Sequence, residues 1–239
     1  MAACEACSAV PEELAGALNV AGVAARFSGR FEQAEAAYAR ALAIAEAAGP
    51  GQLLATLLHN IGGLAHARGR FAEGLIPARR GLSLRETLAG PDDPAVGLDC
   101  AALAALLEGA GDPEEADGLY RRAITLLDPD PAAAREAALA RAGLGSVCQT
   151  QQRLPEAERH YRDALSRFTA TAGRDHPQRA QILNNLATLH RRRGEDTDAR
   201  RLLAEAHDLL LRTFGPDHPV TLEVAGNRAR VDAAPSPYL

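Results

Sequence analysis

The segment Gly29-Arg-Phe-Glu-Gln-Ala34 recurs along this 239-residue chain at a nearly constant spacing. In the same register the chain reads GRFAEG from Gly69, GDPEEA from Gly111, QRLPEA from Gln152 and GEDTDA from Gly194. Successive copies begin 40–42 residues apart. A fixed period of about 20 to 50 residues is the signature of a repeat architecture. The sequence therefore predicts five copies of one structural unit that stack side by side.

We call the first residue of each copy the anchor. Small residues lie at fixed distances from it. Seven residues before the anchor the side chain is always small: Gly22, Gly62, Ala104, Gly145 and Ala187. Nine residues after it lies a tyrosine in three copies, Tyr38, Tyr120 and Tyr161. Small residues let two helix backbones approach closely, and bulky residues fill the space beside them. Glycine at the anchor suits a tight turn, so each unit is predicted to be a helix A, a turn and a helix B.

The linkers between units share a Gly-x-Asp-x-Pro pattern at residues 90–94, 173–177 and 215–219. Glycine ends a helix, Asp or His can cap the next one, and proline fits its first turn. Together with the small residues, the tyrosines and the turn glycine, this pattern resembles the tetratricopeptide repeat, whose usual period is about 34 residues. The longer period here, the Gly-x-Asp-His-Pro linkers and the stretch LNNLA at 183–187 resemble kinesin-light-chain-type repeats.

The resemblance implies an all-α fold, an α-solenoid of about five antiparallel helix pairs with a C-terminal capping helix. Within a solenoid over residues 12–232, we expect repeats at 12–48, 52–89, 95–128, 132–172 and 178–214, and a cap at 220–232. A cap is needed because the last pair would otherwise expose its apolar face. We expect residues 1–11 and 233–239 to be disordered. HEAT-type repeats share the period but do not account for the turn glycine or the small residues.

Composition excludes several classes of protein. All 26 basic residues are arginines and the net charge is −5, which argues against non-specific nucleic-acid binding. No apolar run is long enough to span a membrane, and the N-terminus lacks the features of a signal peptide. Four scattered cysteines are no disulfide framework, so we expect a reducing, cytoplasmic setting. The richness in Ala, Gly and Arg suggests a bacterial source.

Sequence motifs for catalysis or metal binding are missing. The chain contains no H-E-x-x-H, no phosphate-binding loop and no G-x-S-x-G. Cys4 and Cys7 lack the second pair of ligands that a zinc site needs. Cys100 and Cys148 fall on expected A helices, where cysteine packs as a small apolar residue, and His160 falls at a helical repeat position. We therefore expect no enzyme, no metal and no cofactor.

The resemblance also implies where a partner binds, in a concave groove lined by the A helices. The groove positions lie ten, six and three residues before each anchor. Their polar members are the candidate binding residues: Asn19, Arg26, His59, His66, Gln149, Asn184, Thr188 and Arg191. An asparagine amide both donates and accepts, so it can bind the backbone of an extended peptide, and arginine pairs with carboxylates. Alanine and glycine line the middle of the groove along the chain, so we expect the two ends of the groove to make the polar contacts and the middle to accept apolar bulk.

Relatives that bind a C-terminal carboxylate use lysine together with asparagine. This chain has no lysine, so Arg26 or Arg191 would have to bind the carboxylate in its place. The expected function is a non-catalytic scaffold for a protein or peptide partner. The alternative is a peptide-sensing regulatory subunit that acts on a separate output protein. The identity of the partner and the oligomeric state stay open.

Charge is unevenly distributed along the chain. Residues 91–134 contain ten acidic residues and two arginines, whereas residues 51–90 carry five arginines and two glutamates. One interpretation is an acidic surface that attracts a basic partner. The other is structural, because acids in the first turn of a helix B offset the helix dipole.

Overall fold

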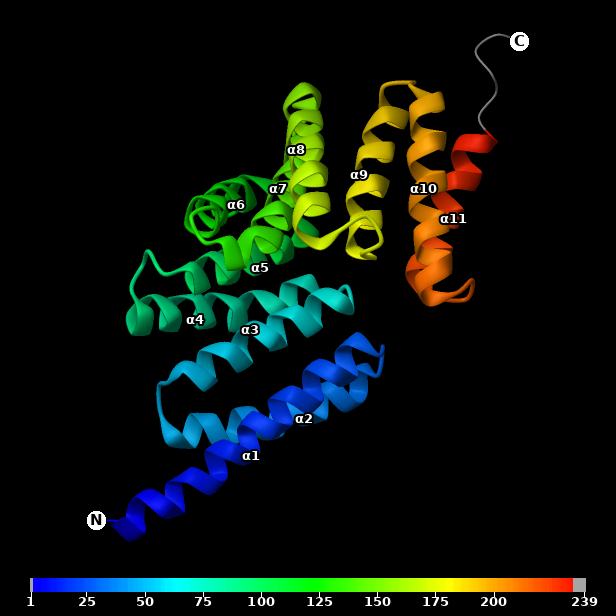
Figure 1. Ribbon diagram of the computed structural model, residues 1–239. Helices are drawn as coiled ribbons and strands as arrows, with labels where there is room; N and C mark the ends of the chain where they lie inside the picture. The colour runs from blue at the N-terminus through cyan, green and yellow to red at the C-terminus, as the bar shows by residue number, and fades with distance from the viewer. Residues whose placement is uncertain (1, 234–239) are drawn as a thin grey trace. The chain divides into compact units, whose positions relative to one another are not determined.

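The structure is a computed structural model that describes residues 2–233, with side chains described from residue 11 onward. Over these residues the chain forms eleven α-helices, one 3-10 helix and no strand (Figure 1). The expected all-α fold of adjacent, packed helix pairs is confirmed. The chain divides into two compact units, Met1–Pro129 and Asp130–Leu239.

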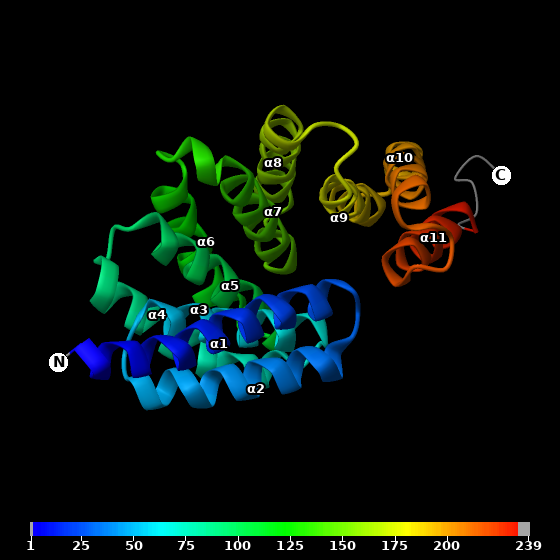
Figure 2. The same cartoon turned by 60° about the horizontal axis from the view of Figure 1, so that its bottom comes forward.

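Unit 1 contains three helix pairs. Their bounds are α1 (Ala2–Phe27), α2 (Phe31–Ala48), α3 (Gln52–Ala67), α4 (Phe71–Ala89), α5 (Pro94–Ala110) and α6 (Pro113–Leu127). The A helices α1, α3 and α5 contact one another in order, so they line one face of the unit (Figure 2). In contrast to the expected disorder of residues 1–11, helix α1 already begins at Ala2 and contains Pro11.

Unit 2 contains two helix pairs and a final single helix. Its elements are η1 (Pro131–Ala133), α7 (Ala134–Thr150), α8 (Leu154–Ala172), α9 (Gln178–Arg192), α10 (Asp196–Phe214) and α11 (Pro219–Asp232). Helix α9 contacts both α7 and α11, so the A helices again succeed one another. Thr221, Val224 and Val231 of α11 are buried, as expected for a capping helix. Of the C-terminal tail, residues 234–239 lie outside the described residues.

The fourth residue of each Gly-x-Asp-x-Pro linker accepts a hydrogen bond from the backbone two residues later, and in two linkers, at Asp93 and His218, it is the N-cap of the next helix. Asp93 accepts a hydrogen bond at Oδ1 from the Ala95 backbone N–H at 2.8 Å. His176 and His218 accept at Nδ1 from backbone N–H groups two residues later, both at 3.3 Å. Such a side-chain acceptor satisfies one of the free N–H groups in the first turn of a helix. This accounts for His176 and His218 without any metal.

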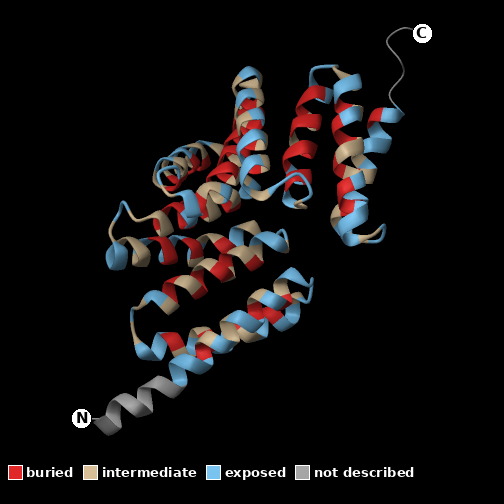
Figure 3. Ribbon diagram, viewed as in Figure 1, coloured by how far each residue is buried: buried red, intermediate tan, exposed pale blue. Residues whose placement is uncertain are grey.

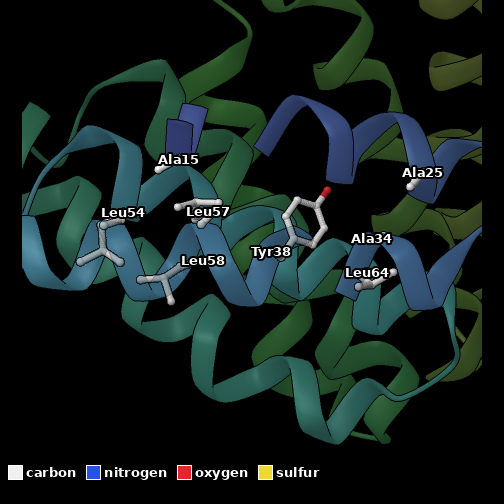
Figure 4. Packing of buried hydrophobic residues seen from close by; sticks show 10 residues of the cluster. Ala15, Ala25, Ala34, Tyr38, Leu54, Leu57, Leu58 and Leu64 are labelled. Atoms are coloured by element: carbon white, nitrogen blue, oxygen red, sulfur yellow. The ribbon is translucent and has the colours of Figure 1, made fainter. Parts of the chain in front are cut away.

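Glycine and tyrosine fit together in the repeat core. A Cβ atom placed on Gly22 would lie 2.4 Å from Cε1 of Tyr38, and one on Gly145 would lie 2.8 Å from Cδ1 of Tyr161. These tyrosines are buried against the neighbouring helix A, and apolar side chains of α1, α2 and α3 surround Tyr38 (Figure 4). Figure 3 shows the result as buried stripes along the helices. In repeats one and four, the glycine seven residues before the anchor is thus required by the tyrosine ring that packs on it.

Two ion pairs between successive B helices of unit 1 join the arginine-rich and the acidic stretch of the chain. Arg79 of α4 pairs with Glu115 of α6 at 2.5 Å, and Glu86 of α4 pairs with Arg122 of α6 at 2.5 Å. The hydrogen bond from Arg79 lowers the pKa of Glu115. These pairs join neighbouring repeats. Glu114 and Glu115 also lie in the first turn of α6, where acids offset the helix dipole as the structural interpretation expects.

Candidate binding face of the A helices

The position three residues before the anchor has a structural partner in two repeats. Tyr120 donates from its hydroxyl to Oε2 of Glu108 at 3.3 Å, and Tyr161 donates to Oε1 of Gln149 at 3.2 Å. Gln149 is only 8% exposed. Its side chain therefore satisfies the buried tyrosine of its own repeat, a contact that the sequence reasoning missed. The regular spacing of twelve residues between the two was the available signal.

Arg26 takes the same position in repeat one, where it has no such partner. Its buried Nε and the buried hydroxyl of Tyr38 both lack a hydrogen-bond partner among the described residues. The guanidinium carbon lies 4.7 Å from the centre of the Phe27 ring, which is 76% exposed. Gly63 of α3 makes room for the guanidinium, since a Cβ there would lie 2.3 Å from Nη1 of Arg26. A charged, planar donor is thus held at the face of α1 and α3.

His66 lies on α3 close to this guanidinium. Its ring packs edge-on against Phe71, with the ring centres 5.4 Å apart. Burial of the ring lowers the pKa of His66, and the positive charge of Arg26 lowers it further. The imidazole is therefore neutral at pH 7, and it can either donate or accept a hydrogen bond without adding charge.

Two of the candidate asparagines link neighbouring A helices in the same way. Asn60 of α3 donates from Nδ2 to Oδ1 of Asn19 on α1 at 2.8 Å. Asn227 of α11 donates from Nδ2 to Oδ1 of Asn184 on α9 at 2.9 Å. Asn184 is only 5% exposed. Both amide oxygens are therefore committed to contacts between helices, whereas the amide N–H groups can still donate.

His59 is engaged inside unit 1. Its Nδ1 lies 2.7 Å from Oδ1 of Asp99, which is only 3% exposed. Nε of Arg85 donates to the other carboxylate oxygen at 2.9 Å. Buried carboxylates are tolerated when they are paired in this manner. The structure thus gives His59 a partner on α5, the next helix A.

In unit 2, the candidate residues of α9 include one exposed charge. The Thr188 hydroxyl donates to the backbone carbonyl of Asn184 at 2.9 Å. Arg191 is exposed and forms no ion pair within the described part of the chain. Its neighbour Arg192 instead donates to the backbone carbonyl of Gln149 at 3.2 Å. Asn184, Thr188 and Arg191 follow one another along one side of α9, at the spacing of helical neighbours.

Sequence comparison assigns this architecture to a family. Family models described as "Tetratricopeptide repeat" match residues 13–87, 100–132 and 135–210. The chain belongs to the tetratricopeptide repeat (TPR) family. None of the curated proteins compared with this TPR chain matches it.

Solved structures show the same fold at low sequence identity. The apo form of RapI is 11% identical, with 90% of this chain and 81% of that chain covered and a TM-score of 0.67. A kinesin light chain from Podosopora anserina with nearly identical TPR-like repeats is 18% identical, with 73% and 83% covered and a TM-score of 0.56. A signal transduction ATPase with a TPR sensor, from Pyrococcus horikoshii, is 13% identical, with 91% and 33% covered and a TM-score of 0.63. The resemblance to TPR proteins, including kinesin-light-chain repeats, is thereby confirmed.

Proposed function

We propose that this TPR protein is a non-catalytic scaffold that binds a peptide or a protein segment on the A-helix faces. The observation that carries the proposal is Arg26, whose buried Nε has no hydrogen-bond partner among the described residues. Leaving a buried polar group without a partner costs roughly 1–3 kcal/mol, and more when the group is charged. A bound carboxylate would supply the missing acceptor.

The surroundings of Arg26 match an acidic group next to an apolar one. A guanidinium binds a carboxylate through two parallel, charge-assisted hydrogen bonds. The neutral ring of His66 can add a third hydrogen bond, and the exposed ring of Phe27 offers an apolar surface beside it. The ligand is therefore an acidic side chain or a C-terminal carboxylate, flanked by an apolar residue.

A second contact surface in unit 2 consists of Asn184, Thr188 and Arg191. The exposed guanidinium of Arg191 supplies a charge. The amide N–H group of Asn184 can donate to the carbonyl of an extended peptide, because its oxygen is already engaged by Asn227. This surface belongs to unit 2 by itself and would bind a ligand independently of the one around Arg26.

A selection from a peptide library with free C-terminal carboxylates tests the first surface. Peptides enriched on the wild-type protein should bind the R26Q variant at least about tenfold more weakly, since a charge-assisted hydrogen bond is worth about 1.5–3 kcal/mol. R40Q is the matched control, because Arg40 is an exposed arginine on α2, a helix B. Equal affinity for R26Q and R40Q would overturn the assignment of Arg26. Amidated versions of the same peptides separate a C-terminal from a side-chain carboxylate.

The combined N184A/R191A variant tests the second surface. Enriched peptides that bind unit 2 should lose affinity on this variant. Unchanged binding of every enriched peptide would remove Asn184 and Arg191 from the proposed site.

The alternative role is that of a sensor subunit, in which peptide binding is passed on to a separate output protein. It is favoured by one structural neighbour, an ATPase whose TPR part is described as its sensor. A sensor would recruit or release a second protein only when the peptide is present. Affinity capture with and without an enriched peptide distinguishes this role from a constitutive scaffold.

A further inference from the structure

Three side chains at the α7–α8 hairpin of unit 2 bring together a thiol, a carboxylate and an imidazole. One ligand atom from each of Cys148, Glu156 and His160 lies within 4.8 Å of the other two. The sequence alone assigned Cys148 to packing and placed His160 at a helical repeat position. The folded hairpin gives them a shared location that is distinct from the proposed peptide-binding residues.

The repeat geometry explains why these groups meet. Cys148 lies on α7 four residues before the turn at Gln152, and its side chain is fully buried. Glu156 and His160 are four residues apart on α8, so they lie on the same side of that helix. Both are partly exposed. An ion held by the partly exposed Glu156 and His160 would therefore have the buried thiol close by.

We propose that Cys148, Glu156 and His160 bind a zinc ion. Zinc takes cysteine sulfur, histidine nitrogen and carboxylate oxygen as ligands in a tetrahedral arrangement, and three protein ligands leave one position for water. Ligand atoms in such a site are about 3.3–3.7 Å apart, from the metal–ligand distances. Nε2 of His160 and Oε1 of Glu156 are already 3.7 Å apart. The thiolate and the carboxylate together balance the charge of the ion.

The second oxygen of Glu156 has a partner of its own. Nη1 of Arg153 donates to Oε2 of Glu156 at 2.8 Å. This contact leaves Oε1 on the side of His160, although Nη2 of Arg159 also lies 3.9 Å from Oε1. Outer contacts of this kind orient a metal-binding carboxylate. All three ligand side chains already take part in other interactions, so zinc would replace some of these contacts.

Zinc at this position would tie α7 to α8 across their turn. An ion that binds the folded but not the unfolded chain raises the melting temperature, and the stabilisation grows with the logarithm of the ratio of free ion to Kd. The thiol must lose its proton to bind, so binding also weakens as the pH falls. The site would therefore stabilise unit 2 in a zinc-dependent way.

Cobalt(II) absorbance tests the proposal, because thiolate ligands give cobalt an intense near-ultraviolet charge-transfer band. The metal-free, tag-free chain is titrated in a C4S/C7S background, so that only Cys148 and Cys100 can give the band. We expect one cobalt ion per chain, displacement of cobalt by zinc, and a rise in melting temperature with zinc. C100S is the matched control, since Cys100 is equally buried on α5 and burial raises the pKa of its thiol to about 11.

Loss of the band in C148S, with the band retained in C100S, supports the site. At least about tenfold weaker cobalt binding by H160Q and by E156Q supports the other two ligands, and these variants decide the matter if C148S does not fold. The proposal is overturned by a chain without the band, by a band that survives in folded C148S, or by unchanged affinity in both H160Q and E156Q.

Discussion

At the scale of single residues, the fold depends on glycine where a tyrosine ring crosses a helix. Gly22 packs against Tyr38, and Gly145 packs against Tyr161. Both pairs can be found in the sequence because each glycine and each tyrosine keeps a constant distance from the anchor. Close approach of a ring to a backbone leaves no volume for a methyl group. The repeat can therefore be predicted from the sequence at positions where steric limits, rather than surface chemistry, determine which residue is allowed.

Replacing Gly22 with alanine tests this packing. The new methyl would lie 2.4 Å from Cε1 of Tyr38, so we expect the free energy of unfolding to fall by about 1–3 kcal/mol, as for other overpacked cores. G118A is the control, because nothing lies within 4 Å of a Cβ placed at this exposed glycine in α6. It should gain up to about 1 kcal/mol from helix propensity. Urea denaturation of both variants gives the comparison, and equal stability would refute the steric argument.

His66 should make the protein less stable in mild acid. Its pKa in the folded protein lies below the ordinary value of 6.5, so the unfolded chain binds the proton more readily. The free energy of unfolding therefore decreases as the pH falls through 6.5 toward the folded-state pKa. H66Q lacks this contribution and should lose less stability than the wild type between pH 7 and pH 5. Parallel losses in urea titrations at the two pH values would contradict the assignment.

At the scale of helices, the positions of the helix ends could be predicted from the sequence, whereas the polar contacts between helices could not. Glycines at the turns and prolines such as Pro94 and Pro219 in first turns are local signals, and local signals can be read from one chain. The hydrogen bond from Asn60 to Asn19 joins residues of different repeats. To predict this hydrogen bond one must know which faces of the two helices meet and how far one helix is shifted along the other. Both are determined by the packing of complete helix pairs.

The capping helix α11 should depend on one such contact. In N227A, the buried Oδ1 of Asn184 loses its donor, which should cost about 1–3 kcal/mol. N185A is the control, since the Asn185 amide oxygen accepts only an exposed hydrogen bond from Gln181 of the same helix. Its effect should stay within about 0.5 kcal/mol. Chemical denaturation followed by circular dichroism measures both, and a cost for N227A no larger than that for N185A would contradict this account of the cap.

Replacing Gln152 with glycine should stabilise the turn between α7 and α8. Gln152 has φ of 62°, whereas the other four anchors are glycines. A side chain in this left-handed conformation costs about 1–2 kcal/mol, part of which is offset because glycine is more flexible in the unfolded chain. We expect Q152G to raise the free energy of unfolding by up to about 1 kcal/mol. The reverse change at an anchor, G111Q, should lower it, and thermal melts showing the opposite signs would refute the explanation.

At the scale of the whole molecule, each unit gathers its A helices on one face. In unit 1 these are α1, α3 and α5, and in unit 2 they are α7, α9 and α11. This arrangement follows from the repeat period alone, because every unit of the sequence repeats the same helix pair. The partner does not follow from it. Gln149 and His59 lie at expected groove positions but serve contacts inside the units, whereas Nε of Arg26 lacks a hydrogen-bond partner among the described residues.

Hydrogen–deuterium exchange with a library-selected peptide tests most directly the claim that the A-helix faces bind the partner. With peptide bound, we predict slower exchange in α1 and α3 near Arg26 and His66, and slower exchange in α9 for peptides that bind unit 2. The B helices α2, α4, α8 and α10 should exchange as they do without peptide. Protection confined to those B helices would contradict the account.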